Sequence, residues 1–314
     1  MLASAACTLR NAETGGEPIA RAPERLHDGP RHGIGQGMSD KSTGAVPITA
    51  DALIYLRTHS PLARRLGINC PYDHLFLTDA GGDLAKMALA LDPVYEQFNL
   101  VRYAWFAETM SAHAARYPQL VILGSGYDTR SLTLPALQRG RCRVFEVDLP
   151  AVLTTKRRVL ADHGVALPKT VQFVSCDLNV DDLRGRLAAA GFDTGEPAAV
   201  VMEGVYFFLS GDRKAALLEP AVLGLARGSA LTFDAWTARR VETLNAKIIA
   251  RTGRPLFGAP TLGDSAASAE AAVRRLGYGE VRVTTLDAMC RQLGVDAVAD
   301  PLAESWLLIE ARVT

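Results

Sequence analysis

A glycine loop and an acidic residue in the middle of the chain are spaced as in nucleoside-binding proteins. Gly124-Ser125-Gly126 ends a short apolar segment, and its two glycines let the backbone turn sharply and approach a ligand closely. Asp148 ends the next apolar segment, roughly 20 residues further on, the spacing at which an acid accepts hydrogen bonds from ribose hydroxyls. The pair therefore predicts a site for an adenosine-type ligand.

Two later apolar segments also end in residues that could bind such a ligand. Asp177 and Leu178 end the third segment, where a carboxylate could accept from an exocyclic amine while leucine covers one face of a flat base. Glu203 ends the fourth segment and could receive an ammonium group. A lone acid of this kind is commonly a helix cap or a turn residue. Since parallel strands bring their carboxyl ends to one sheet edge, four such ends together predict a binding site.

Seven apolar, β-branched segments carry these residues and define the predicted fold. They span residues 120–124, 142–148, 171–177, 199–204, 229–234, 280–286 and 305–313. Nearly continuous apolar runs are typical of strands buried on both faces, and the segments between them have helical length. The pattern predicts an α/β fold: a doubly wound, Rossmann-like domain over residues 118–314 with a seven-stranded, mostly parallel sheet. The short connection between the last two segments allows one antiparallel edge strand.

The remaining segments predict a tail, a cap and a lid. Residues 1–47 are rich in Gly, Pro and charged residues and are expected to form a flexible tail, within which Met38 is a second candidate start. Residues 48–117 have helical periodicity and predict a helical cap. Residues 235–265 interrupt the strand–helix alternation and predict a lid over the site.

The composition excludes several classes of protein. The chain has 314 residues, 48% hydrophobic, with 34 basic and 34 acidic side chains, so no summed positive field favours nucleic acid or a membrane surface. Five scattered cysteines form no CxxC pair, and no metal-ligand spacing is evident near the strand ends. We expect a cytoplasmic protein, monomeric or homodimeric, with neither a signal peptide nor a membrane span.

Four sequence blocks resemble those of the leucine carboxyl methyltransferase-like family. They are VILGSGYDTR at 121–130, VFEVDLPAVLTTKRRVL at 144–160, VSCDL at 174–178 and VMEGVYFFLS at 201–210. The family comprises class I S-adenosylmethionine-dependent O-methyltransferases, including protein phosphatase carboxyl methyltransferases and bacterial enzymes of secondary metabolism. The resemblance extends more weakly from about Thr49 to the end of the chain, and implies S-adenosyl-L-methionine as the cofactor.

The resemblance also implies a role for each matching residue. It assigns the methionine portion to Gly124, Ser125 and Gly126, the ribose to Asp148, the adenine to Asp177 and Leu178, and the amino-group region to Glu203. Arg102 matches the family arginine that pairs with the methionine carboxylate. The family usually has Asp shortly after that arginine, whereas this chain has Ala107 and Glu108. The early helical segment also departs from the family pattern, which suggests an acceptor other than a phosphatase tail.

We therefore expect an O-methyltransferase acting on a carboxylate or hydroxyl of a small molecule, polyketide-like or another secondary metabolite. A carboxylate acceptor is already ionised at pH 7 and needs no general base, whereas a phenol or alcohol needs one. Tyr127, Tyr206 and Arg254 are the candidates for the acceptor pocket, although a tyrosine is more often a packed aromatic and an arginine a solvated surface residue. None of the six histidines falls at a strand end.

Two other functions remain open. A nicotinamide-dependent oxidoreductase also uses a glycine turn followed by an acid, but Thr129 stands where the third small residue of that fingerprint belongs. Alternatively, a methyltransferase fold could retain the cofactor only as a structural ligand or as the signal of a sensor. Turnover with a methyl acceptor separates that reading from an enzyme.

Overall fold

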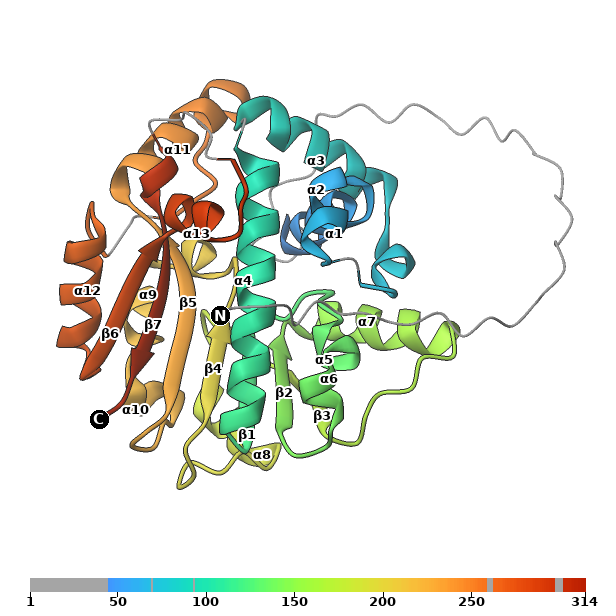
Figure 1. Ribbon diagram of the computed structural model, residues 1–314, viewed down its shortest axis with the longest axis vertical. Coiled ribbons are helices and arrows are strands. Elements are labelled where there is room, and N and C mark those ends of the chain that lie inside the picture. The colour runs from blue at the N-terminus through green and yellow to red at the C-terminus, as the bar shows by residue number, and fades with distance from the viewer. Residues whose placement is uncertain (1–44, 69, 93, 259–261, 297–301) are drawn as a thin grey trace, which may run out of the picture.

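The computed structural model describes residues 45–68, 70–92, 94–258, 262–296 and 302–314. At its centre is one seven-stranded sheet with the strand order β3-β2-β1-β4-β5-β7-β6. Figure 1 shows helices on both sides of this sheet and a separate group of helices, in blue, at the N-terminal end. This is the predicted doubly wound α/β architecture.

The strands lie close to the predicted segments. They are β1 (Gln119–Leu123), β2 (Arg143–Asp148), β3 (Val171–Ser175), β4 (Ala199–Met202), β5 (Ala230–Trp236), β6 (Glu280–Thr285) and β7 (Trp306–Arg312). The first five pair in parallel, and β7 is antiparallel to both β5 and β6. Every residue of β1, β4 and β5 is buried, as expected for strands covered on both faces.

The antiparallel strand does not lie where the sequence suggested. We expected it at the sheet edge, but β7 lies between β5 and β6, and β6 is the edge. The burial of the two strands explains the order: β7 is buried over most of its length, whereas no residue of β6 is fully buried. The more apolar strand takes the interior position because it gains more from burial.

Helices and short turns connect the strands and build the N-terminal part. They are α1 (Ala45–His59), α2 (Pro61–Leu66), η1 (Asp73–Phe76), α3 (Asp79–Leu91), α4 (Tyr95–Arg116), α5 (Arg130–Thr133), α6 (Pro135–Gln138), α7 (Pro150–Asp162), α8 (Leu183–Ala189), η2 (Tyr206–Phe208), α9 (Gly211–Ala216), α10 (Pro220–Leu223), α11 (Ala238–Thr252), α12 (Ala266–Arg275), α13 (Leu286–Gln292) and η3 (Ala303–Ser305). Helices α4, α11 and α13 pack on one face of the sheet, and α8, α10 and α12 pack on the other.

The N-terminal helices form the expected cap, although its limits differ from the prediction. Helix α1 begins at Ala45, within the predicted tail of residues 1–47; residues 1–44 lie outside the described part of the chain. Helix α4, the last of the predicted cap, packs against both the sheet and α1–α3, so it joins the two layers. A second apolar cluster joins α1 and η1 to α7 and Tyr127. The cap therefore rests on the segment that follows β1.

No helix in the described residues is long and apolar enough to cross a membrane.

Candidate ligand-binding site

The glycine loop has the backbone conformation that the sequence required. Gly124 and Gly126 have φ angles of +65° and +48°, a region that other residues rarely adopt. A Cβ atom at Gly124 would lie 2.2 Å from Val205 Cγ2, so this position also has no room for a side chain. The backbone N–H of Gly124 donates to the Val147 carbonyl at 2.8 Å, which ties the loop to β2.

Asp148 supports this loop directly. One of its carboxylate oxygens accepts from the Gly126 backbone N–H at 2.6 Å, and the other accepts from Leu149 N–H at 2.7 Å. Each oxygen has two lone pairs, so one acceptor position per oxygen remains for a ligand. Burial raises the pKa of Asp148, and the two N–H donors oppose that effect. Asp148 thus holds the loop and keeps capacity for hydroxyl donors.

Ser125, between the two glycines, has a buried hydroxyl with no hydrogen-bond partner among the described residues. A buried hydroxyl without a partner is costly, so a ligand that supplies one would be favoured here. The glycine loop, the Ser125 hydroxyl and the Asp148 carboxylate together fit a ribose-bearing ligand.

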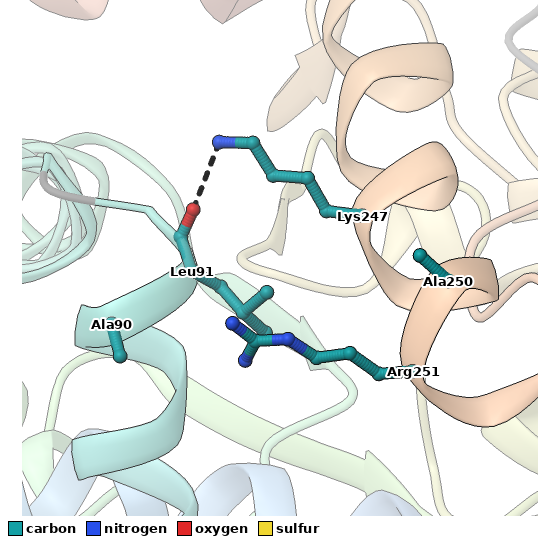
Figure 2. A pocket seen from close by; sticks show the side chains of 5 residues that line it. All are labelled: Ala90, Leu91, Lys247, Ala250 and Arg251. Atoms are coloured by element: carbon teal, nitrogen blue, oxygen red, sulfur yellow. Dashed lines mark hydrogen bonds between the residues drawn. The ribbon is translucent and has the colours of Figure 1, made fainter.

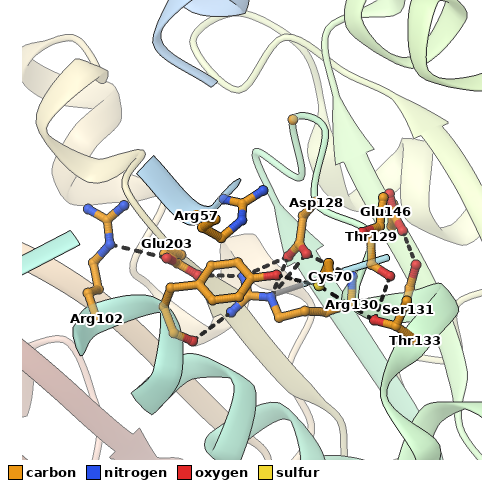
Figure 3. Close-up of polar contacts among 12 residues, drawn as sticks. Arg57, Cys70, Arg102, Asp128, Thr129, Arg130, Ser131, Thr133, Glu146 and Glu203 are labelled. Carbon is orange, nitrogen blue, oxygen red and sulfur yellow. Dashed lines mark hydrogen bonds and ion pairs between the residues drawn. The ribbon is translucent and has the colours of Figure 1, made fainter. Parts of the chain in front are cut away.

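A cluster of charged side chains lies beside the loop (Figure 3). Arg102 on α4 donates to Glu203 at 3.2 Å, and Arg130 forms ion pairs with both Glu203 and Asp128. These side chains are at most 12% exposed. Burial acts to raise the pKa of Asp128, but Arg130 outweighs it, so the pKa lies below its usual value. Glu203, the predicted ammonium acceptor, is thus held between two guanidinium groups.

Asp234 on β5 extends this cluster under the loop after β4. It accepts from Arg102 at 3.2 Å, from the Gly204 backbone N–H at 2.6 Å and from Trp306 Nε1 at 2.9 Å. Asp234 is completely buried, and burial raises its pKa despite these partners. This carboxylate connects the charged cluster to the aromatic side chains of β7.

The cap reaches the same cluster through Tyr103. The guanidinium of Arg57 on α1 lies 4.4 Å from the Tyr103 ring centre, and that of Arg130 lies 4.1 Å from it. Arg57 is held by a bidentate ion pair with Asp73, at 2.7 and 3.0 Å. The Tyr103 hydroxyl contacts Cys70 Sγ at 3.1 Å. Cation–π contacts of this kind thus connect the cap to the wall of the site.

A buried ion pair between Lys156 and Glu146 fixes the segment after the glycine loop. Lys156 on α7 donates to Glu146 and to the backbone carbonyl of Asp128, and Ser131 donates to the other oxygen of Glu146. Lys156 and Glu146 are at most 1% exposed. Because all these groups are satisfied, the segment carrying Asp128 and Arg130 is held in one position.

The third predicted strand end is more exposed. Asp177 is half-buried and accepts from Asn179 N–H at 2.9 Å, the pattern of an Asx turn. The Leu178 side chain is buried in the core cluster behind the sheet, and its carbonyl accepts from Arg213 at 2.9 Å. Both stay predictions for the adenine position.

The three acceptor-pocket candidates do not come together. Tyr127 stacks on Phe76 of the cap, with ring centres 5.0 Å apart. Tyr206 is buried in the cluster behind the sheet, with its ring tilted against Phe233. Arg254 is exposed in the segment after α11. The two tyrosines thus pack against other aromatic rings in different clusters, and the three residues stay predictions for the acceptor pocket.

Aromatic residues gather at the ends of β4 and β5: Trp236 and Phe257 belong to the predicted lid, whereas Phe207 and Trp306 had not been predicted as site residues. Phe207 stacks on Trp236 with ring centres 4.0 Å apart, Phe257 packs edge-on against Trp236 at 4.6 Å, and Trp306 does so at 5.3 Å. The indole N–H of Trp236 is buried with no hydrogen-bond partner among the described residues. These four rings, hereafter the aromatic cluster, lie next to Asp234.

The predicted lid, residues 235–265, contains two rings of this cluster, because its first residues belong to β5 and include Trp236, and its later part includes Phe257. Helix α11 leads to Phe257, whose backbone is held by Asn245: its carbonyl accepts from Nδ2 at 2.9 Å, and its N–H donates to Oδ1 at 3.1 Å. At the other end of the lid, Arg240 is buried and paired with Asp92. The segment after β5 thus forms one wall of the aromatic cluster.

A surface hollow of about 370 Å³ separates α11 from the end of α3. Figure 2 shows its lining residues, Ala90, Leu91, Lys247, Ala250 and Arg251, with Lys247 donating to the Leu91 carbonyl at 2.9 Å. That hydrogen bond satisfies a helix-end carbonyl, so Lys247 joins the lid to the cap.

No group of three or more potential metal ligands occurs in the described residues.

Solved structures show the class of this fold. A protein from Thermobifida fusca provisionally named a methyltransferase aligns with a TM-score of 0.56 at 21% identity, covering 80% of this chain and 98% of that one. A DUF574 family protein from Streptomyces avermitilis aligns with a TM-score of 0.57 at 16% identity, covering 85% and 97%. The fold is that of class I, Rossmann-like methyltransferases.

The family follows from sequence. The model of the leucine carboxyl methyltransferase family matches residues 57–222. A relative from Mycobacterium avium, provisionally named an S-adenosyl-L-methionine-dependent methyltransferase, is 32% identical over 225 residues, covering 68% of this chain and 70% of that one. The chain belongs to the leucine carboxyl methyltransferase family, as its sequence blocks predicted.

Other relatives match over shorter stretches. Proteins with the same provisional name are 38% identical over 159 residues in Mycolicibacterium gilvum and 39% identical over 154 residues in Rhodococcus jostii. Those matches cover 63% and 51% of the relatives and 50% and 47% of this chain. The chain thus spans about half to two thirds of the first curated relatives it matches.

Proposed function

We propose that this protein is an S-adenosyl-L-methionine-dependent O-methyltransferase acting on a carboxylate or hydroxyl of a small molecule. The observation that carries the proposal is the meeting, at one sheet edge, of the glycine loop, the Asp148 carboxylate and the Arg102–Glu203 ion pair. The relatives' provisional names support the same cofactor.

The residues of the edge divide the cofactor between them. Asp148 offers its remaining acceptor positions to the ribose hydroxyls, and the Ser125 hydroxyl and the loop backbone contact the methionine portion. Arg102 and Glu203 offer one group of each sign to the carboxylate and ammonium ends of an amino acid. When bound, S-adenosyl-L-methionine supplies a methyl group on a positively charged sulfur.

For direct methyl transfer the protein mainly needs to orient the acceptor and exclude water. The aromatic cluster provides an apolar wall next to the cofactor edge, and the unpartnered Trp236 N–H could donate to an acceptor oxygen. A carboxylate acceptor is already ionised at pH 7, whereas a hydroxyl acceptor would need a general base, for which the Asp234 carboxylate next to these rings is the candidate.

The test is titration calorimetry of the protein against S-adenosyl-L-methionine, S-adenosylhomocysteine and NAD in one buffer. We expect micromolar binding of the first two and none of the third. Asp148→Ala should weaken binding by about 1–3 kcal/mol, since it removes a charged hydrogen-bond acceptor. Binding of NAD alone would move the site to nicotinamide chemistry.

Binding does not distinguish an enzyme from a sensor. A screen with methyl-labelled cofactor and small carboxylic acids, phenols and alcohols should therefore follow. We expect label in a methyl ester or a methyl ether, and binding without any turnover would favour the sensor.

A further inference from the structure

Asp51 on α1 is a buried carboxylate with an unfilled position. The residue is 8% exposed, and one of its oxygens accepts from the Thr78 hydroxyl at 2.8 Å. The other oxygen is buried with no hydrogen-bond partner among the described residues. Neither the sequence blocks nor the strand-end pattern pointed to this residue, because it lies in the cap.

The packing of the cap holds Asp51 in place. A Cβ atom at Gly81 on α3 would lie 2.5 Å from Asp51 Cβ, so the two helices touch through glycine. The Thr78 hydroxyl that donates to Asp51 also accepts from Gly81 N–H at 3.0 Å, which caps α3. Whichever carboxylate oxygen accepts from Thr78, the other one is left without a partner.

Helix α1 touches the glycine loop at the residue before Asp51. The preceding residue, Ala50, has its Cβ 3.5 Å from the point where a Cβ at Gly126 would be. Burial raises the pKa of the Tyr127 hydroxyl, and the charges of Asp51 and Asp148 both raise it further, so both carboxylates lie near that side chain. The cap thus brings a second acid to the loop that Asp148 supports.

An unpartnered buried carboxylate costs stability unless a ligand supplies a donor. The Ser125 hydroxyl of the neighbouring glycine loop also has no hydrogen-bond partner in the described chain. One ligand that reaches both the Asp51 oxygen on the cap helix and the Ser125 hydroxyl in the loop would supply both missing partners.

We propose that Asp51 is a ligand-binding residue, whose free oxygen accepts a hydrogen bond from an N–H or O–H group of the nucleoside-type ligand in the glycine-loop site. The cap would then complete the site instead of only covering it. This inference rests on the proposed cofactor class.

The experiment compares Asp51→Asn with the wild type by titration calorimetry and thermal unfolding of the full chain. To keep the hydrogen bond that the Thr78 hydroxyl donates, an asparagine presents its oxygen to Thr78, which leaves an NH2 group where the free carboxylate oxygen was. A ligand donor would then face another donor. We expect S-adenosylhomocysteine to bind about 10- to 100-fold more weakly.

The melting temperature of the ligand-free protein should stay the same or rise, because an uncompensated buried charge has been removed. Asp83→Asn is the matched control: Asp83 is an exposed acid on α3 of the same cap. It should leave both the affinity and the melting temperature at the wild-type values.

A second ligand locates the contact. If Asp51→Asn weakens 5′-methylthioadenosine as much as S-adenosylhomocysteine, the donor is on the nucleoside; if it weakens only the latter, the donor is the amino group. Either result supports the inference.

Wild-type affinity in Asp51→Asn would overturn the inference, as would weaker binding together with a melting temperature several degrees lower, the sign of a structural role. Failure of the wild type to bind any adenosine ligand would instead refute the proposed function. The two failures are thus distinguishable.

Discussion

The two halves of the sheet edge are built from different chemistry. At the ends of β1 and β4, Arg102, Arg130, Asp128 and Glu203 form a buried cluster in which the charges neutralise one another. At the end of β5 and the start of β7, uncharged rings pack around Trp236: Phe207 stacks on it, and Phe257 and Trp306 pack edge-on against it. The charged half suits a polar ligand of fixed structure, and the aromatic half suits an apolar acceptor.

Asp234 connects the halves, since it accepts from Arg102 on one side and from the Trp306 indole on the other. Buried charges need partners in defined positions, whereas ring packing tolerates changes of shape. The comparison teaches that cofactor binding should depend on single polar groups and that acceptor choice should depend on ring volume.

Removing Arg130 should have the largest effect. Arg130→Ala leaves Asp128 and Glu203 as buried carboxylates with fewer partners, and such a change costs about 3–5 kcal/mol. Denaturant unfolding measures the loss.

Arg158→Ala is the control for this change. Arg158 forms a surface ion pair with Asp162 at 3.2 Å, and surface pairs contribute only about 0–1 kcal/mol. Equal losses in the two variants would contradict the view that the charged half depends on its ion pairs.

The next effect belongs to the aromatic half. Phe257 is half-buried, so Phe257→Ala should cost about 2 kcal/mol, less than the 3–5 kcal/mol typical of a fully buried ring. Cofactor affinity should stay within about twofold of the wild type, while the KM for the acceptor should rise about tenfold, equivalent to ~1.4 kcal/mol. Calorimetry and initial rates with labelled cofactor give the two values. A weaker cofactor affinity with an unchanged acceptor KM would reverse the assignment of the halves.

The strands and their terminal acids could be predicted because they are local features. Continuous apolar runs define buried parallel strands, and the segments around Asp148 and Glu203 fell within two residues of their predicted ends. The order of β6 and β7 was predicted wrongly, although the more apolar segment of β7 carried a usable signal for an interior position.

Contacts between distant segments also escaped prediction. Arg102 and Glu203 are far apart in sequence, and the resemblance assigned each to the ligand instead of to the other. Asp234 ended a predicted strand, and Asp128 and Arg130 lay within a quoted block, so the residue types were a usable signal. What was absent was the packing that brings them together.

The dependence of the unfolding free energy on pH should distinguish the two halves, because only the charged half takes up protons. Burial acts to raise the pKa of Asp128, but Arg130 outweighs it and holds the pKa below the unfolded value. As the pH falls, Asp128 therefore takes up a proton in the unfolded chain before it does so in the folded protein. Ionised Asp128 contributes fully to the free energy of unfolding above its unfolded pKa. This contribution is lost as the pH falls through the pKa of Asp128 in the folded protein. One proton changes the unfolding free energy by at most about 1.4 kcal/mol per pH unit.

Unfolding of Asp128→Asn between pH 5 and pH 3 should accordingly show a flatter profile than the wild type. Phe257→Ala should show the wild-type slope at lower stability, because the aromatic half takes up no proton. Parallel profiles for all three proteins would remove the electrostatic distinction between the halves.

The last prediction concerns the glycine loop beside the charged half and separates the cost of backbone strain from the loss of a ligand contact. Gly126 has a φ of +48° and Gly140 a φ of +71°, so an alanine at either position should cost about 1–2 kcal/mol of stability from its left-handed conformation. Gly140 has no atom within 4 Å of the added Cβ, and Gly126 has only Ala50 at 3.5 Å. The two free energies of unfolding, measured with a denaturant, should therefore match.

Only Gly126→Ala should also weaken the binding of S-adenosylhomocysteine in calorimetry, because its new methyl group enters the space between the loop and the cap. Equal affinities in the two variants would place the ligand away from that space, and would leave Gly126 with a purely conformational role.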